Sequence, residues 1–93
     1  MKKTKILVVE DQSVVREGVV AILSLQDDME VVGEAVDGLV AVEMARKTKP
    51  DVILLDMVMP DLDGMGVLTR LRDARIATPA IVQTAHGSIE AVI

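Results

Sequence analysis

Acidic side chains follow two apolar runs of this chain. Asp56 comes directly after residues 52–55, and Glu10 and Asp11 come directly after residues 6–9. An unbroken apolar run bounded by turn residues is typical of a strand that is buried on both faces. Open parallel sheets bind their ligands at the carboxyl ends of such strands. These carboxylates are therefore the first candidates for chemistry.

Carboxylates in this arrangement suit a cation and a phosphoryl group. If the two strands are neighbours, Glu10, Asp11 and Asp56 converge and repel one another unless a cation lies among them. Mg²⁺ fits, because it binds through one or two carboxylates and keeps several waters. Asp56 can then act as a nucleophile that forms an acyl phosphate. Thr84 ends a later apolar run, and its hydroxyl can donate a hydrogen bond to a phosphoryl oxygen.

Plainer structural roles compete with these chemical ones. An acid at a strand end often only caps the following helix. On spacing alone, this capping role is as well supported for Glu10 and Asp11 as a chemical role. Asp61 and Asp63 lie in a segment bounded by proline and glycine, which predicts turn and cap residues. Thr84, taken alone, is better explained as an ordinary strand residue.

Segments of strand and helix type alternate four times. Strands are predicted over residues 5–9, 29–36, 52–56 and 80–84. A helix is predicted after each strand: around residues 15–23, over residues 37–47, after Gly64 and after Gly87. This alternation indicates the α/β class with a parallel sheet, and right-handed crossovers place helices on both faces. Residues 1–93 are enough for one domain at most.

The first helix carries the clearest apolar face. Val15, Val19, Ile22 and Leu23 follow the i, i+4, i+7, i+8 spacing of a helix that buries one side. In the second helix, Asp37 is expected to cap the amino terminus, and a proline ends the helix at its other end.

Composition excludes several classes of function. The net charge is −5 and there is no Phe, Tyr or Trp, so direct nucleic-acid binding by this segment is not expected. No apolar run approaches the roughly 20 residues that span a bilayer, and we expect no membrane association. Cysteine is absent, which removes disulfides and thiolate metal sites and favours a cytoplasmic location.

Three motifs in register resemble the receiver domain of bacterial two-component response regulators. They are residues 8–11 (VVED), residues 54–64 (LLDMVMPDLDG) and residues 84–85 (TA). The resemblance covers the whole chain in the right order, and the loop after Asp56 is its most specific part. It implies a flavodoxin-like, doubly wound parallel sheet with strand order 2-1-3-4-5.

The resemblance also implies a mechanism for signal transduction. A sensor histidine kinase would transfer a phosphoryl group to Asp56, with Mg²⁺ held by Glu10 or Asp11, by Asp56 and by the backbone carbonyl of Val58. Thr84 would be the switch hydroxyl. The domain would be a phosphoacceptor that switches an output domain, most often in transcription regulation, rather than an enzyme. Slow self-dephosphorylation and a homodimer are both compatible with this family.

One departure from the family concerns the end of the chain. The family has a phosphoryl-pairing lysine on its fifth strand, whereas Lys5, Lys47 and Lys49 all belong to the opposite end of the predicted sheet. We therefore expect a receiver domain truncated at its carboxyl end, without the fifth strand, the last helix or an output domain. The strand over residues 80–84 would then have no partner on its outer edge.

Two other classes of function stay open at this point. A Mg²⁺-dependent enzyme that cleaves nucleic acid could pair Glu10 with Asp61 and Asp63, although the sequence offers no basic surface for such a substrate. An inert dimerisation module with the same fold is the third class.

Overall fold

The computed structural model describes the backbone of residues 2–56, 58–59, 62–83 and 89–92 and the side chains of residues 2–55 and 66–82. Its helices are α1 (Ser13–Ser24), α2 (Gly38–Thr48) and α3 (Gly64–Asp73). Its strands are β1 (Thr4–Val9), β2 (Met29–Ala35), β3 (Val52–Asp56), β4 (Val58–Met59), β5 (Leu62–Asp63), β6 (Ala80–Gln83) and β7 (Ile89–Val92).

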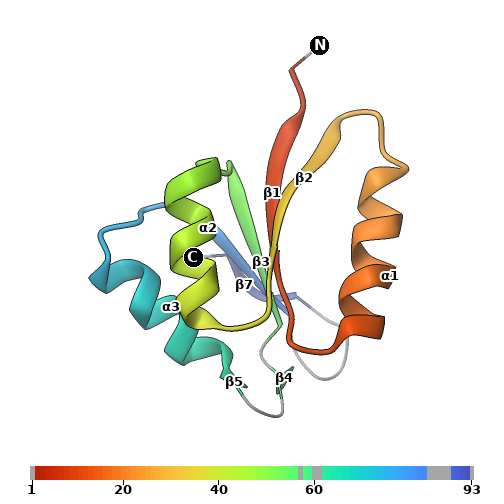
Figure 1. Cartoon of the computed structure of the whole chain (residues 1–93). Coiled ribbons are helices and arrows are strands. Elements are labelled where there is room, and N and C mark those ends of the chain that lie inside the picture. The colour runs from red at the N-terminus through yellow and green to blue at the C-terminus, as the bar shows by residue number, and fades with distance from the viewer. Residues whose placement is uncertain (1, 57, 60–61, 84–88, 93) are drawn as a thin grey trace.

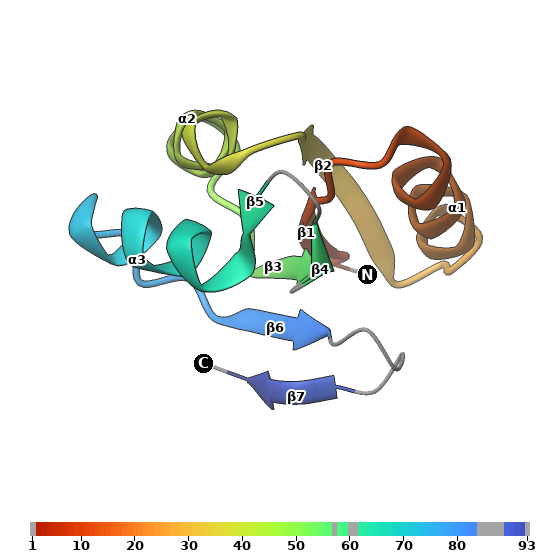
Figure 2. The same cartoon turned by 90° about the horizontal axis from the view of Figure 1, so that it is seen from below.

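The main sheet has the strand order β2-β1-β3-β6-β7. Its first four strands pair in parallel, whereas β7 is antiparallel to β6. The helix α1 covers one face of the sheet, and α2 and α3 lie side by side on the other (Figure 1). The view from below shows the same three layers (Figure 2). The predicted α/β class and the predicted order of the first four strands are confirmed.

The apolar core lies between the sheet and the pair of helices α2 and α3. Alternate residues of the two central strands contribute fully buried side chains to it, namely Leu7, Val9, Ile53 and Leu55. The helices contribute small and branched side chains, namely Ala41, Ala45, Val67, Leu68 and Leu71. This alternation follows the two-residue period of a strand, so the intervening residues face α1.

The second helix begins and ends as the sequence predicts. The Asp37 carboxylate accepts a hydrogen bond of 2.9 Å from the Val40 N–H, which satisfies one of the amide groups left open at a helix start. At the other end Lys49 adopts the left-handed conformation, with φ of 49°, and Pro50 follows. Both features stop the helix at Thr48.

The predicted inward face of α1 is half right, because two of its four residues face the sheet and two are exposed. Ile22 is 63% exposed and Val15 is also exposed, whereas Arg16, Val19 and Leu23 are partly buried. The apolar pattern counts a charged residue as solvent-facing, so it missed the inward position of Arg16. A long Arg side chain can bury its stem and still place its charged head in a polar contact.

The packing of α1 on the sheet is loose. All of its side chains are described, and none of them is buried. Beside it lies an apolar cavity of about 260 Å³, whose lining includes Leu23 of α1, Ile6 of β1 and Leu54 of β3. Apolar contact alone therefore holds α1 less firmly than it holds α2 and α3.

The predicted helix after Gly87 is wrong over residues 89–92, which form β7. This strand pairs with β6, so the prediction that β6 has no partner on its outer edge is also wrong. An open strand edge presents a row of unpaired N–H and C=O groups. A helix of a few residues is marginal, whereas a short segment with Ile89 and Val92 at its ends suits a strand.

Across the part of the chain that the structure describes, no helix is long and apolar enough to cross a membrane.

The central position of β1 gives a stability prediction with a matched control. Leu7 is 0% exposed in the core, and Leu25, just after α1, is 80% exposed. We expect Leu7→Ala to lower the free energy of unfolding by about 2–5 kcal/mol, because it removes buried contacts and leaves a cavity. Leu25→Ala should change it by less than about 0.5 kcal/mol. Urea unfolding followed by far-ultraviolet circular dichroism measures both, and equal losses would contradict this description of the core.

Candidate functional site

The parallel pairing of β1 with β3 brings the predicted acidic residues to one edge. Val9 is the register partner of Leu55, so Glu10 and Asp56 are the next residues along two neighbouring strands. Adjacent parallel strands lie about 4.8 Å apart. The backbones of Glu10 and Asp56 are therefore neighbours at the carboxyl edge of the sheet. The two strands that lead to them, β1 and β3, lie side by side in Figure 1.

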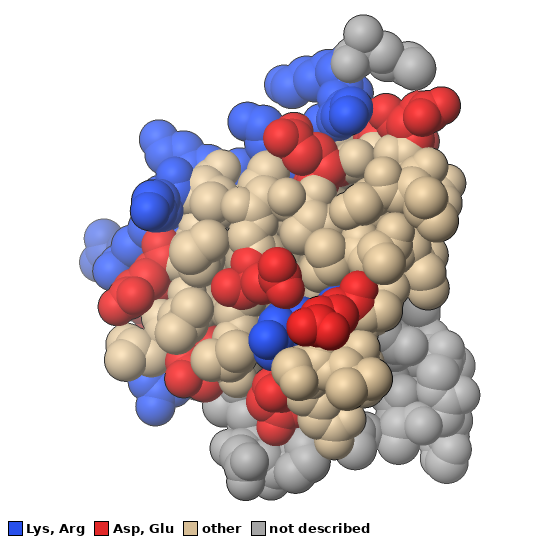
Figure 3. Space-filling model, turned by 45° about the vertical axis from the view of Figure 1, so that its right-hand side comes forward, with Lys and Arg blue, Asp and Glu red and all other residues tan. Residues whose placement is uncertain are grey.

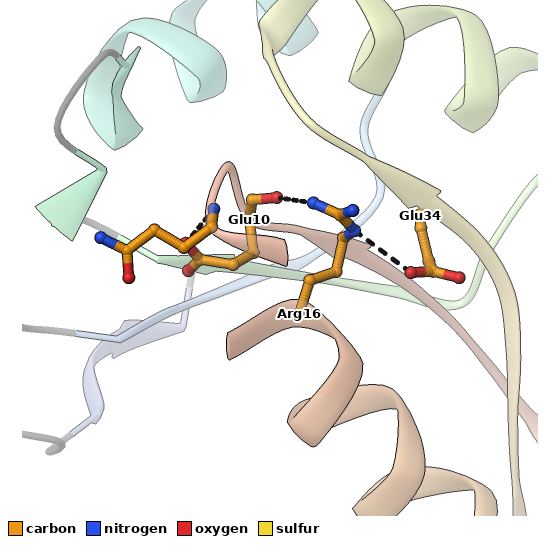
Figure 4. Close-up of polar contacts among 4 residues, drawn as sticks. Glu10, Arg16 and Glu34 are labelled. Carbon is orange, nitrogen blue, oxygen red and sulfur yellow. Dashed lines mark hydrogen bonds and ion pairs between the residues drawn. The ribbon is translucent and has the colours of Figure 1, made fainter. Parts of the chain in front are cut away.

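Glu10 is held firmly within this edge. Its side chain is buried, with the residue only 3% exposed. Its backbone N–H donates to the Ala35 carbonyl of β2 at 2.9 Å. One carboxylate oxygen, Oε1, accepts a hydrogen bond of 3.0 Å from the Gln12 N–H (Figure 4). A buried carboxylate needs such donors, and these contacts fix the turn that leads from β1 to α1.

Asp11 lies next to Glu10 in the same turn. Its side chain is partly buried, and its Oδ1 atom is shielded from solvent. The structure thus places two consecutive acids between the end of β1 and the start of α1. Both acids follow β1 directly, as the predicted strand over residues 5–9 implies.

Arg16 is the residue at this site that sequence reasoning missed. Its Nη1 donates to the backbone carbonyl of Glu10 at 3.0 Å, and its Nε lies 3.2 Å from Oε1 of Glu34 (Figure 4). The side chain of Arg16 is 16% exposed, and that of Glu34 is 46% exposed. One signal in the sequence could have suggested this role. Arg16 is a charged residue in the first turn of the helix that follows the acidic pair.

Other predicted site residues are described only in part. Asp56 is the last residue of β3, and its backbone is paired with Gln83 of β6, but its side chain lies outside the described residues. Val58 lies in β4, which pairs antiparallel with β5 in a small hairpin. Asp61 and Thr84 lie outside the described residues, as does the side chain of Asp63.

The described part of the site fits Mg²⁺ in its chemistry. Glu10 and Asp11 offer carboxylate oxygens, the hard ligands that Mg²⁺ prefers, and one of these oxygens is shielded from solvent. Among the described residues, no group of three His, Cys, Asp or Glu side chains could hold a metal ion. The other predicted ligands, Asp56 and the Val58 carbonyl, belong to the end of β3 and to β4.

The lysines excluded from the site lie where the sequence predicts. Lys5 is near the start of β1, and its backbone N–H donates to the Asp51 carboxylate at 2.9 Å. Lys47 and Lys49 lie at the end of α2. All three belong to the amino-terminal edge of the parallel strands. In Figure 3, Lys and Arg side chains lie mainly along the upper and left border of this face, and some lie lower down beside acidic side chains.

Doubly wound α/β domains bind ligands at the carboxyl ends of their strands, which is the edge where β1 leads into Glu10 and β3 ends at Asp56. Comparison with known protein families matches residues 6–93 to the response regulator receiver domain. The chain belongs to this family. The receiver-domain resemblance of the sequence is thereby confirmed.

The chain is similar to part of several longer proteins, and these relatives have different names. The uncharacterized transcriptional regulatory protein YhcZ of Bacillus subtilis is 40% identical over 89 residues, which are 96% of this chain and 42% of that protein. A protein-glutamate methylesterase/protein-glutamine glutaminase of Myxococcus xanthus is 42% identical over 89% of this chain and 24% of that protein. The chain thus spans less than half the length of these curated relatives.

Solved structures give the same result. The response regulator domain of Thermotoga maritima CheB matches with a TM-score of 0.81 and 37% identity, over 98% of this chain and 66% of that one. The signal receiver domain of the putative response regulator NarL from Mycobacterium tuberculosis matches with a TM-score of 0.80 and 40% identity, over 95% of this chain and 71% of that one.

The acidic turn gives a metal-binding prediction. Mg²⁺ that binds only the folded state stabilises it, so it should raise the melting temperature of the wild type. Asp11→Ala should lose most of this rise, and without Mg²⁺ it should remain folded because it relieves repulsion between carboxylates. The exposed Asp27, in the turn before β2, supplies the control Asp27→Ala, which should keep the rise. An undiminished Mg²⁺ effect in Asp11→Ala would show that the metal binds elsewhere.

Proposed function

We propose that Asp56 is the phosphoacceptor of a two-component signalling pathway. A carboxylate oxygen of Asp56 attacks the phosphorus of a phosphohistidine on a sensor histidine kinase. A P–O bond forms as the P–N bond breaks, the histidine leaves with the bonding electron pair, and Asp56 carries an acyl phosphate. The new charge at the sheet edge then changes the partners that the domain binds.

One observation carries this proposal. The register of β1 against β3 supports it, because the backbones of the next residues, Glu10 and Asp56, are neighbours and Asp11 follows Glu10 in the chain. The last residues that these two strands pair with each other, Val9 and Leu55, are both buried in the core, so this edge adjoins closely packed apolar side chains. A reacting group needs this kind of fixed scaffold to be held in a productive geometry.

The residues proposed to hold Mg²⁺ are Glu10 or Asp11, Asp56 and the backbone carbonyl of Val58. When bound, Mg²⁺ would offset the charge that develops on the transferred phosphoryl group. Glu10 and Asp11 would hold the Mg²⁺ ion at this edge of the sheet. The shielded position of Asp11 Oδ1 would reduce competition from water for the ion. The Thr84 hydroxyl would donate to a phosphoryl oxygen and report the modification to the neighbouring surface.

The proposed outcome is control of an output domain in the whole protein. Relatives named as transcriptional regulators favour transcription as the regulated process, whereas the methylesterase relatives show that other outputs occur with similar domains. The proposed partner is a histidine kinase, with a second copy of the chain as a further partner. We propose that the domain signals rather than catalyses, apart from slow loss of its own phosphoryl group, and that it works in the cytoplasm.

Two aspartates at the opposite ends of β3 test the acceptor assignment. Asp51 precedes this strand at the other edge of the sheet, where its carboxylate accepts from the Lys5 N–H, and Asp56 ends the strand. With a small phosphodonor and Mg²⁺, the wild type and Asp51→Asn should gain one phosphoryl group by intact mass. Asp56→Asn should gain none, because the amide is not a comparable nucleophile.

Equal labelling of Asp56→Asn and the wild type would contradict the assignment. Circular dichroism of both variants checks that neither result comes from unfolding.

A further inference from the structure

Arg16 joins three elements at the acidic edge. It projects from the first turn of α1, donates to the Glu10 carbonyl at the end of β1, and pairs with Glu34 of β2. Glu34 is the register partner of Val8, so the guanidinium bridges two neighbouring strands as well as the helix (Figure 4). The planar guanidinium can serve two acceptors in fixed directions, which an ammonium group cannot.

The rest of α1 offers little to fix this turn. The helix buries no side chain, and its N-cap residue, Gln12, makes no side-chain capping hydrogen bond. An apolar cavity adjoins Leu23 near the other end of the helix. The contacts of Arg16 are therefore a main tether between the start of α1 and the end of β1, and the two acids lie between these two points.

The charge of Arg16 raises an apparent conflict. A cation beside Glu10 and Asp11 should repel Mg²⁺, while a hydrogen bond that fixes the Glu10 carbonyl should prepare the acids to bind it. Glu34 resolves the conflict, because its carboxylate lies 3.2 Å from Arg16 Nε and offsets much of the charge. The benefit of fixing the Glu10 carbonyl is then larger than the cost of repulsion between Arg16 and Mg²⁺.

We propose that Arg16 is a positioning residue that holds the Glu10–Asp11 turn ready for Mg²⁺, and that Glu34 is the counter-ion that makes this arrangement favourable. The proposal rests on the proposed function, since the metal matters through phosphoryl transfer to Asp56. Arg16 acts through the backbone of Glu10 and does not itself touch the metal or the phosphoryl group.

The test compares Arg16→Gln, Glu34→Gln and the double variant in the whole protein, with Arg46→Gln as control. Arg46 is an exposed residue of α2 in the last turn, at the other end of the domain. Two readouts are titrated with Mg²⁺: the rate of phosphorylation by a small phosphodonor and the melting temperature by circular dichroism. The second readout needs no phosphorylation.

Each variant has a distinct expected result. Arg16→Gln should raise the Mg²⁺ concentration for half-maximal effect by about tenfold, as is common when a residue that supports metal ligands is lost. Its rate at saturating Mg²⁺ should stay close to that of the wild type. Glu34→Gln should also raise the required Mg²⁺, but this effect should shrink at high salt, because it comes from an uncompensated surface charge. The double variant should require the same Mg²⁺ concentration for half-maximal effect as Arg16→Gln.

An unchanged or lowered Mg²⁺ requirement in Arg16→Gln, equal to that of Arg46→Gln, would overturn the proposal. If Arg16→Gln does not fold, Arg16→Lys replaces it; this variant keeps the charge but not the two directed donors, and it should still raise the Mg²⁺ requirement. A wild type that takes up no phosphoryl group would refute the proposed function instead. The Mg²⁺-dependent melting temperatures would still decide the role of Arg16.

Discussion

The parallel pairing of β1 with β3 is the constraint on which the rest of the site depends. It makes the backbones of Glu10 and Asp56 neighbours, with Asp11 next in the chain, so three acidic residues belong to one edge of the sheet. Such an arrangement is unfavourable without a cation or hydrogen-bond donors. The strands tolerate it because their preceding residues, from Leu7 to Val9 and from Ile53 to Leu55, lie in or beside the core. Core packing thus sustains an arrangement that the charges alone would oppose.

The neighbouring backbone and Arg16 hold the acidic turn in place. The Glu10 N–H is bound to Ala35 of β2, its carboxylate accepts from Gln12, and its carbonyl accepts from Arg16. These three polar groups of Glu10 therefore have three different partner residues. These polar contacts fix the turn. Tight apolar packing of α1 does not contribute, because none of the described side chains of that helix is buried.

Sequence patterns predicted the fold well where a single short-range rule applies. The buried strands and the cap at Asp37 result from unbroken apolar runs and from turn chemistry. The patterns failed where contacts between residues far apart in the sequence determine the local structure. Arg16 faces inward because its acceptors lie on β1 and β2, and residues 89–92 form a strand because the edge of β6 is open to them. The acids Glu10 and Asp11 stood out in the sequence because they follow a strand, whereas the contacts of Arg16 with Glu10 and Glu34 became visible only in the three-dimensional arrangement.

Direct chemical location of the phosphoryl group tests the central claim most plainly. Borohydride reduces an acyl phosphate to an alcohol, so a phosphorylated aspartate becomes homoserine and is found by peptide mass mapping. After treatment with a phosphodonor and Mg²⁺, homoserine should appear at position 56 and should be absent when Mg²⁺ is withheld. Homoserine at position 11 or 61 instead, or at none of the aspartates, would contradict the account of this sheet edge as the phosphoacceptor site.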